Sequence, residues 1–265
     1  MPVRDHKAFI LPDEDTVIWR YVDLEKFESM LNDKSLFFCR SDKFSDPFEG
    51  TVPKIESEFR IKTYMEFNAI QDGEINKEEA VKFSNDVAKY HKKLRSAFVV
   101  NCWHINKGES DAMWRLYLKT NEGIAIQSTV ERLKQALIDY KEDIWISKVR
   151  YLDYEKDIWF HQDEYPNTGY NFFSPIIHKR LAFAHESELR IFQQINEAVG
   201  NEKYWENKPN HIGKQIPIDI ENLIEKIILP PTSDEFVKNK VKGLLKKNGL
   251  NRRIEQSKLN EEPHY

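Results

Sequence analysis

The sequence predicts an α+β fold in a single domain, built on a central mixed or antiparallel sheet with flanking amphipathic helices. Two observations lead to this prediction. Apolar, β-rich runs alternate along the chain with segments whose apolar residues recur at helical spacing. No repeat, Gly/Ser linker or low-complexity tract divides the 265 residues, a length that suits one large domain. We therefore expect residues 1–265 to form a single domain.

The start of the chain predicts a strand, a helix and a second strand. Residues 17–21 are β-branched and aromatic, as strands prefer, and Asp23 follows as a natural helix N-cap. Apolar residues then recur at helical spacing from 24 to 31. An apolar run at 36–39 predicts the second strand, and the Asp-Pro pair at 46–47 ends regular structure beyond it.

The next segment predicts two amphipathic helices and a buried strand. Between 55 and 95 the sequence is charged, with apolar residues at roughly helical intervals and a break at 71–73. Residues 97–103 form a continuous apolar, β-rich run, which is typical of a strand buried on both faces.

Helix and strand then alternate twice more. Asp111 is expected to cap a short helix, and 123–126 forms the next strand. Residues 130–140 predict a helix, and 144–151 alternate with period two, as a half-buried strand does.

The last third predicts a helix around 177–183, a strand at 188–192 and a late strand at 224–229 that two prolines end. A basic helix follows near 234–247, so that 220–250 holds a C-terminal strand and helix. Residues 254–265 have the character of a tail.

Composition excludes several classes of function. The 40 basic and 44 acidic residues are interspersed and give a net charge of −4, so no long-range field attracts nucleic acid or an anionic membrane. No apolar run approaches a membrane span, and the first residues lack the apolar stretch of a signal peptide, so we expect a cytoplasmic protein. Cys39 and Cys102 lie in apolar runs, which favours buried thiols over a disulfide or a nucleophile.

The loop at 40–50 is the first block that predicts a site. It follows a strand directly and combines Arg40, Phe44, Asp46, Phe48 and Glu49 around an Asp-Pro turn. Loops on a rigid scaffold supply many binding groups. A purely structural turn, held by two buried phenylalanine rings, is an equally open interpretation.

The second block joins Cys102-Trp103-His104 to the helix after Asp111. Trp114 and Tyr117 lie three residues apart on one helical face, where their rings could form the floor of a pocket for a planar ligand. The alternative, an aromatic stripe that belongs to the core, is the more common arrangement.

The third block runs from Lys179 to Arg190. If its strand begins near Glu186, the side chains of Glu186, Glu188 and Arg190 project to one face, where two crowded carboxylates and a cation shift each other's acidity. Such groups serve acid/base chemistry or stabilise positive charge in a transition state. An exposed edge strand with a paired Glu and Arg is the structural alternative.

Several common sites are excluded by motif. The chain has only nine glycines and lacks both Gly-x-Gly-x-x-Gly and the P-loop pattern. It also lacks His-Glu-x-x-His, paired Cys-x-x-Cys and Gly-x-Ser-x-Gly, and its eight histidines are dispersed. No metal site is therefore predicted.

Taken together, these blocks resemble the bacterial domain-of-unknown-function 2971 family over about residues 17–195. The resemblance rests on Trp-Arg-Tyr at 19–21, Phe-Ser-Asp-Pro-Phe-Glu at 44–49, Met-Trp-x-x-Tyr at 113–117 and Glu-x-Glu-x-Arg at 186–190. Ser45 stands where this family usually has Asn, and Phe183 where Trp is common. The family has no settled activity, so the resemblance implies a fold and a site but no reaction.

A weaker resemblance connects the architecture to ADP-ribosyltransferases, and it implies NAD as a substrate that binds as a small nucleotide. In that comparison Glu188 is the catalytic carboxylate and Glu186 orients the nucleophile of a protein or nucleic-acid acceptor. Arg20 or Arg40 would hold a phosphate, with Tyr21, Phe44, Phe48, Trp114 and Tyr117 around the nucleotide, and Asp46, Glu49, Lys179 and Arg190 as further polar groups.

Two other classes stay open. One is a nuclease or phosphodiesterase that holds a divalent ion between Asp46, Glu49, Glu186 and Glu188. The other is a non-catalytic module whose aromatic cleft binds a nucleotide or a peptide.

Overall fold

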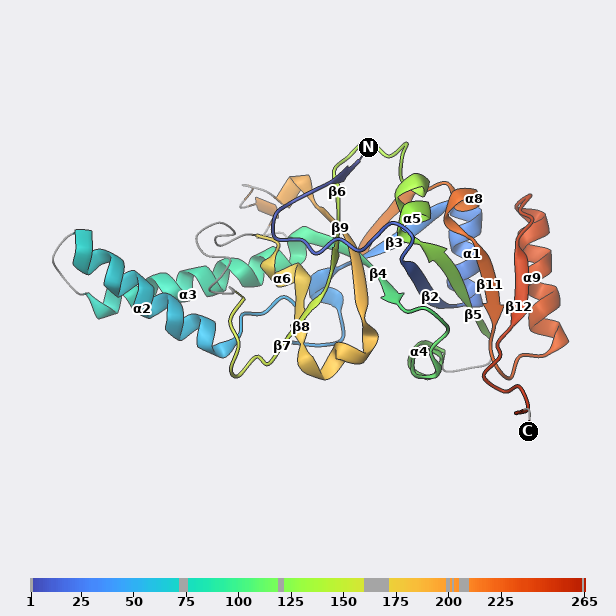
Figure 1. The fold of residues 1–265 in the computed structure, drawn as a ribbon. Helices are drawn as coiled ribbons and strands as arrows, with labels where there is room; N and C mark the ends of the chain where they lie inside the picture. The colour runs from blue at the N-terminus through green and yellow to red at the C-terminus, as the bar shows by residue number, and fades with distance from the viewer. Residues whose placement is uncertain are drawn as a thin grey trace.

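A ten-stranded mixed sheet forms the centre of the structure, which is a computed structural model (Figure 1). The structure describes residues 2–71, 76–118, 122–159, 172–198, 201, 203–204, 210–263 and 265. The strands of the sheet are β1 (Val3–Arg4), β2 (Val17–Asp23), β3 (Ser35–Arg40), β4 (Phe98–Ile105), β5 (Gly123–Thr129), β6 (Ile144–Lys148), β9 (Glu188–Gln194), β10 (Gly213–Pro217), β11 (Lys226–Leu229) and β12 (Arg253–Gln256).

Their spatial order is β1-β6-β9-β4-β2-β5-β11-β12, and β3 lies between β4 and β10. The pairs β1/β6 and β11/β12 are parallel, whereas the other pairs are antiparallel. The predicted class, an α+β fold on a mixed sheet, is therefore confirmed.

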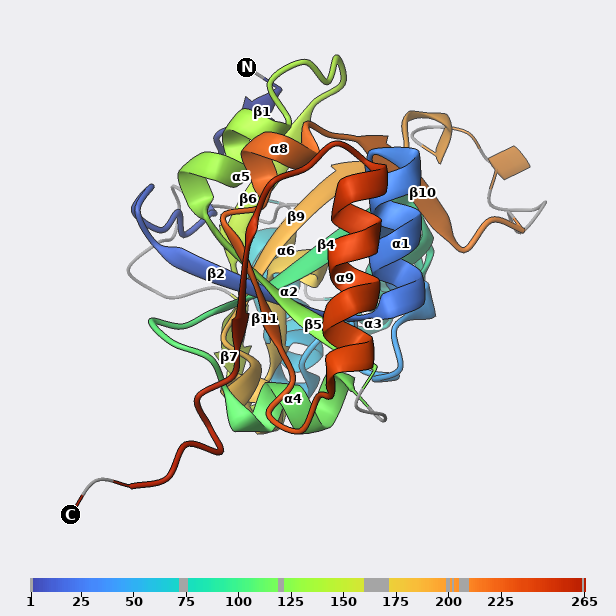
Figure 2. The ribbon, with the colours of Figure 1, turned by 90° about the vertical axis from the view of Figure 1, so that its right-hand side faces the viewer.

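Helices cover one face of this sheet, and a large cluster of apolar side chains lies between them and the strands. These helices are α1 (Leu24–Asp33), α5 (Val130–Ala136), α8 (Ile220–Leu223) and α9 (Glu235–Lys247). Figure 2 shows α9 beside α1 on this face. Each of the four begins after a side chain that accepts a hydrogen bond from the first turn, as at Asp23 of α1 and Asp234 of α9.

Smaller elements cover the opposite face. α4 (Asp111–Tyr117) packs against β2 and β5, and α6 (Ser174–Ile177) packs against β4 and β9. A second, two-stranded sheet pairs β7 (Arg150–Leu152) in parallel with β8 (His178–Arg180), and a 3-10 helix, η4 (Leu181–Glu186), leads from β8 to β9.

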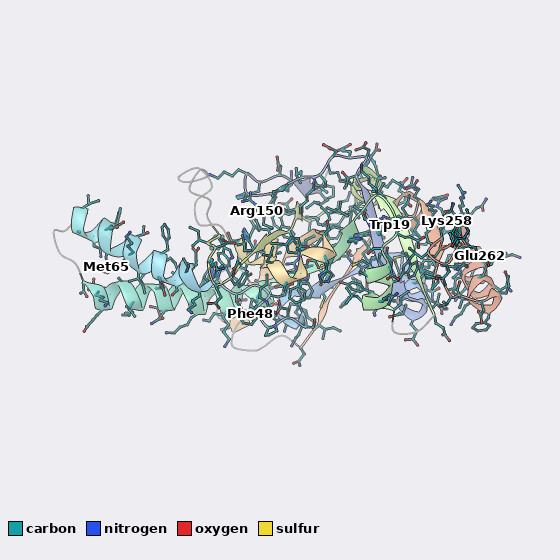
Figure 3. All side chains as sticks on the ribbon, turned by 60° about the horizontal axis from the view of Figure 1, so that its bottom comes forward. Trp19, Phe48, Met65, Arg150, Lys258 and Glu262 are labelled. Carbon is teal, nitrogen blue, oxygen red and sulfur yellow. The ribbon has the colours of Figure 1, made fainter. Side chains whose placement is uncertain are left out.

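Two long helices, α2 (Lys54–Gln71) and α3 (Lys77–Leu94), pair as a hairpin that projects from the body of the molecule (Figure 1). Figure 3 marks this projection by Met65 and the body by Trp19, with Phe48 between them in that view. The two helices confirm the pattern of residues 55–95, although Asp72 and Gly73 of the predicted break lie outside the described residues.

The sheet splits at β4, and this split positions the site. On one side β4 pairs with β9 from Phe98 to His104. On its other side, β3 pairs only with Val99 and Val100, and β2 pairs only with His104 and Ile105. Residues 101–103 therefore present a strand edge that neither β2 nor β3 covers.

Asn101 holds the two arms of the split together. Its amide donates to Phe37 O of β3 at 2.9 Å, and its Oδ1 accepts from Arg20 Nη1 of β2 at 3.1 Å. The same Oδ1 accepts from Trp103 Nε1 at 2.8 Å, and the side chain is almost fully buried. A polar residue inside a buried strand is thus explained by the hydrogen bonds that it satisfies.

Four predicted boundaries differ from the structure. Ser110, and not Asp111, caps α4, because its side chain accepts from Met113 N while Asp111 pairs with Arg115 in the first turn. The helix expected at 130–140 ends at Ala136 and continues as single turns. The strand expected at 144–151 is broken at Val149, where the chain leaves β9 to pair with β8. The strand β12 takes in the first three residues of the predicted tail.

The segment before β9 also differs. Residues 178–180, predicted within a helix, form strand β8 because they pair with β7, and tertiary pairing outweighs local helix preference. The next strand begins at Glu188 and not near Glu186, because Ser187 adopts the left-handed conformation with φ 40°. The prediction that Glu186 lies on the same strand as Glu188 and Arg190 is therefore wrong. Glu188 and Arg190 do lie two residues apart on strand β9 and share one of its faces.

No helix within the described residues combines the length and the apolar character that crossing a bilayer requires.

The bridging role of Asn101 is testable by the substitution Asn101→Leu, which keeps the volume and removes the polar atoms. Phe37 O, Arg20 Nη1 and Trp103 Nε1 then each lose a partner, so we expect the free energy of unfolding to fall by about 2–4 kcal/mol. Urea denaturation measures the change. The exposed Asn222→Ala on α8 is the control and should cost less than about 0.5 kcal/mol; an equal loss in both variants contradicts the bridging role.

Candidate functional site

A cleft of about 700 Å³ opens where the sheet splits. Residues 100–104 of β4 lie along it, and β2, β3, α4, η4 and β9 contribute its walls. This volume is in the range that small-molecule and cofactor sites occupy.

The split lets the two faces of the sheet meet in one cleft. Arg20 lies on the same face of β2 as Ile18 and Val22, which belong to the large cluster on the first face. Glu188 alternates with Leu189 and shares the second face with Phe192. Both Arg20 and Glu188 line the cleft, which an unbroken sheet would not allow.

Arg190 is the centre of a buried charge cluster behind one wall of the cleft. It is 1% exposed, and its Nε donates to Glu188 Oε2 at 2.8 Å. Its Nη2 contacts both oxygens of Glu49, at 2.8 and 3.1 Å, and Nη1 donates to Ile176 O at 2.7 Å. All three nitrogens of the guanidinium are therefore engaged, and they hold Glu188 and Glu49 in place.

Lys179 of β8 completes this charge cluster. Its Nζ lies 2.6 Å from Glu186 Oε2, 3.4 Å from Glu188 Oε1 and 3.3 Å from Glu49 Oε1. Three carboxylates thus share two cations, which leaves one net negative charge when all five groups are ionised.

The two glutamates differ sharply in acidity. Burial raises the pKa of Glu186 to about 7, and the negative charge of Glu188 adds to this shift. Burial alone would also raise the pKa of Glu188, but Arg190 and Lys179 outweigh it and hold that pKa at about 2. At neutral pH Glu188 is therefore ionised, while Glu186 exchanges a proton readily.

Lys179 stays charged in this environment. Burial by itself would lower its pKa, but the charges of Glu188 and Glu49 raise the pKa above its usual range. The same two glutamates raise the pKa of Arg190, again against the effect of burial.

Arg20 lies in the cleft without a carboxylate partner among the described residues. Its Nη1 donates to Cys102 O at 2.7 Å and to Asn101 Oδ1 at 3.1 Å, so the guanidinium is anchored on the uncovered edge of β4. Burial lowers the pKa of Arg20. An anchored and desolvated guanidinium with donors to spare is suited to an anionic ligand.

An ion pair fastens the Asp-Pro loop to the end of β8, and neither phenylalanine ring of the loop is fully buried. Arg180 donates to Asp46 through Nη2 at 2.7 Å and Nε at 3.1 Å. Asp46 also accepts from Phe48 N, and Gly50 with φ 70° turns the chain after Glu49. Phe48 itself is exposed, and its ring lies 4.3 Å from the Arg180 guanidinium.

Most of the predicted site residues converge on this cleft. Those that line it are Arg20, Tyr21, Phe44, Asp46, Glu49, Tyr117, Lys179, Glu186 and Glu188. Arg190 lies directly behind them in the charge cluster.

Three predicted residues lie elsewhere. Arg40 is buried and pairs with Asp42 at 2.6 Å. Trp114 packs in the cluster under α4 and donates to Glu109, so that Met113 and Tyr117 of this helix line the cleft and Trp114 does not. Phe48 lies outside the lining, as described above.

Aromatic rings of the cleft lie beside both cations of the charge cluster. Phe44 lies 5.6 Å from the Arg190 guanidinium and Phe183 lies 4.7 Å from Lys179 Nζ. Burial raises the pKa of Tyr117, and Glu186 is the largest charge that adds to this shift. Tyr117 also affects the pKa of Arg20, so its hydroxyl contributes to both the basic and the acidic part of the cleft.

Sequence reasoning missed three residues that shape the site. Asn101 orients Arg20, the Tyr151 hydroxyl accepts from Glu188 N at 2.8 Å, and the His104 ring contacts Glu186 O at 2.6 Å. Asn101 had a visible signal, since it is the one polar residue within the apolar run 97–103. His104 stood in the second sequence block without a role of its own, and Tyr151 had no signal, because the partners of both are distant in sequence.

Neither a metal centre nor a cysteine nucleophile is visible in the described part of the chain. No group of three or more His, Cys, Asp or Glu side chains there is placed to hold a metal ion. Both cysteines are free, and burial raises the pKa of the Cys102 thiol.

Comparisons with known proteins give little further guidance. No protein-family model matches the sequence, and no curated protein matches it. The resemblance to the domain-of-unknown-function 2971 family therefore stays a prediction. Among solved structures, DarT of Thermus sp. 2.9 in complex with NAD+ aligns over 94% of this chain and 98% of that chain, with 10% sequence identity and a TM-score of 0.39. A match this low carries no argument about the site.

The raised pKa of Glu186 makes stability depend on pH. The folded state binds a proton at Glu186 up to about pH 7, whereas the unfolded state releases it near 4.5. Stability from this group is therefore present below pH 4.5 and is lost as pH rises through 7. We expect Glu186→Gln, which mimics the protonated form, to reduce the loss of stability between pH 5 and pH 8 by roughly 2 kcal/mol.

Chemical denaturation at several pH values measures this effect. Glu131→Gln, at an exposed glutamate of α5, is the matched control and should leave the pH dependence unchanged. Parallel pH curves for wild type and Glu186→Gln would show that Glu186 titrates normally.

Proposed function

We propose that this protein cleaves the bond between nicotinamide and ribose in NAD and transfers the ADP-ribosyl group to an acceptor. One observation carries the proposal. A single cleft holds Arg20, which is anchored and has no carboxylate partner among the described residues. On another wall it holds two carboxyl groups whose pKa values are shifted in opposite directions, that of Glu186 upward and that of Glu188 downward. NAD carries its negative charges on the pyrophosphate and its positive charge on the nicotinamide ring, which matches this division of charge.

Glu188 has the properties of the catalytic carboxylate in this reaction. When the C–N bond breaks, its electron pair leaves with nicotinamide and positive charge develops on the ribose. A buried carboxylate that is ionised at neutral pH, as Glu188 is, stabilises that charge more strongly in the transition state than in the ground state. Arg190 and Tyr151 hold it in position.

Glu186 is suited to act as the general base. The nucleophile of the acceptor forms a bond to the ribose carbon and must lose a proton, which the Glu186 carboxylate takes up. A base works best when its pKa lies near the working pH, and the pKa of Glu186 is about 7. The short contact with Lys179 and a hydrogen bond with Glu188 hold the Glu186 carboxyl group in the cleft.

Arg20 is the group that would bind the pyrophosphate. Nη1 is held by the edge of β4, so the remaining N–H groups of the planar guanidinium are oriented before the ligand arrives. Phe44, Phe183 and Tyr117 supply flat surfaces for the nicotinamide or adenine ring.

The charge pairing disfavours the metal-dependent alternative. Asp46 is paired with Arg180, and Glu49, Glu186 and Glu188 all contact Lys179 or Arg190. A divalent cation would therefore have to compete with Lys179, Arg180 and Arg190, which already pair with these carboxylates.

Release of nicotinamide from NAD by the purified protein tests the proposal directly, with chromatography as the readout and with EDTA in a parallel reaction. We expect release that EDTA does not affect, and Glu188→Gln should reduce it by about 100-fold or more. Glu235→Gln, at an exposed glutamate of α9, is the matched control and should keep wild-type activity. Cleavage of nucleic acid only with Mg²⁺ would support a nuclease, and tight NAD binding without any release would support a binding module.

Arg20 can be tested separately from the chemistry. Arg20→Lys keeps the charge but loses the planar fork, so we expect the KM for NAD to rise about tenfold while kcat changes less. Steady-state kinetics of nicotinamide release measure both constants. Arg115→Lys, at an exposed arginine of α4, is the control; an unchanged KM in Arg20→Lys would mean that Arg20 does not bind the substrate.

A further inference from the structure

His104 of β4 lies beside the corner of the chain that carries Glu186 and Glu188, and the sequence block that contains it gave it no role of its own. It lines the cleft, it is 5% exposed, and its Nδ1 lies 2.6 Å from the backbone oxygen of Glu186. A carbonyl oxygen only accepts hydrogen bonds, so Nδ1 must carry the proton and donate. This contact fixes the tautomer of the ring.

The second ring nitrogen of His104, Nε2, makes no contact with the described residues that would require a histidine at this position. His104 Nε2 is buried without a hydrogen-bond partner among the described residues. Burial lowers the pKa of His104, and the nearby His185 adds to this effect, so the ring is neutral. The Nδ1 contact with Glu186 is the one hydrogen bond of its ring in this part of the chain.

That contact fastens a strained corner of the backbone. Between Glu186 and Glu188 the chain passes through Ser187, whose φ of 40° is unfavourable for a residue with a side chain. Two consecutive residues of β4 hold this corner, because His104 donates to Glu186 O and Ile105 N donates to Ser187 O at 2.8 Å. The backbone that carries Glu186 is therefore positioned from β4.

Glu186 depends on such support more than Glu188 does. Glu188 lies on a regular strand and pairs in register with His104 itself, whereas Glu186 ends a short 3-10 helix. The charged and titratable groups around Glu186 are Lys179 of β8, Glu188 of β9, Tyr117 of α4 and the neutral His104 of β4. A displacement of about 1 Å is enough to impair a catalytic group.

We infer that His104 is a positioning residue, which holds the Glu186 carboxylate in its productive place through the hydrogen bond from Nδ1 to the Glu186 backbone oxygen. The inference rests on the proposed function, in which Glu186 is the general base. His104 takes no proton from the substrate in this role.

Three substitutions separate this role from the alternatives. Asn places an amide N–H near the position of Nδ1, Gln places its amide near the position of Nε2, and Ala removes both. We expect His104→Ala to lower kcat for NAD cleavage about tenfold or more with little change in KM, His104→Asn to restore most of it, and His104→Gln to resemble His104→Ala.

The pH profile supplies a readout that a general loss of stability would not produce. The rising limb of kcat should have its midpoint near pH 7, set by Glu186. In His104→Ala the midpoint should move to lower pH, because a displaced Glu186 is better solvated, and His104→Asn should restore it. The inference is overturned if His104→Ala keeps the wild-type kcat and the wild-type midpoint. It is also overturned if His104→Ala loses activity and His104→Gln, but not His104→Asn, restores it.

Direct titration of the glutamate carboxyl groups by ¹³C NMR tests whether His104 positions Glu186, and it does not require the protein to be catalytically active. The Glu186 resonance, assigned by its loss in Glu186→Gln, should titrate lower in His104→Ala than in wild type and in His104→Asn. If wild type cleaves no NAD, the proposed function fails, and this measurement still tests the contact with His104. If NAD is cleaved but Glu186 titrates alike in all variants, only the inference about His104 fails. Should His104→Ala not fold, the comparison of His104→Asn with His104→Gln gives the same decision.

Discussion

The uncovered edge of β4 is the constraint on which the site depends. Backbone groups at a buried strand edge must find partners, and here neither neighbouring strand supplies them for residues 101–103. Arg20 accordingly donates to Cys102 O, and Asn101 bridges to Phe37 O with its side chain. Because side chains rather than a strand satisfy this edge, the two arms stay connected and space for a cleft remains between them. The same contacts therefore create the cleft and orient one of its functional groups.

The wall of the cleft that holds Glu186 and Glu188 is stabilised in a different way, because it contains buried charges, and burying a charge costs free energy. Removing five ionisable groups from water is unfavourable unless each is paired, and the geometry around Arg190 and Lys179 provides that pairing. The pairing is uneven, because Glu188 contacts both cations while Glu186 contacts only Lys179. This unevenness is the physical reason for their different acidity. An evenly neutralised pair would offer neither a strong stabilising charge nor a base that titrates near neutral pH.

The elements that carry these groups are tied together by contacts between distant parts of the chain. Arg180 joins the Asp-Pro loop to β8, Arg190 joins β9 to Glu49, and His104 joins β4 to the corner before β9. Each of these residues lies on or beside a regular strand. Loops with unusual backbone conformations are in this way held by the rigid sheet, which is how a fold can place flexible segments accurately.

The sequence by itself determined the class of fold, most of the regular elements and most of the residues that gather at the cleft. Helical and strand periodicity depend on local spacing, so α1, β4 and the pair α2 and α3 were predictable from their own residues. Only the tertiary structure decided that 178–180 form a strand, that Trp114 is core while Tyr117 is not, and that Glu186 reaches the cleft from a 3-10 helix. These outcomes depend on pairing partners far away in the chain, which no local pattern encodes.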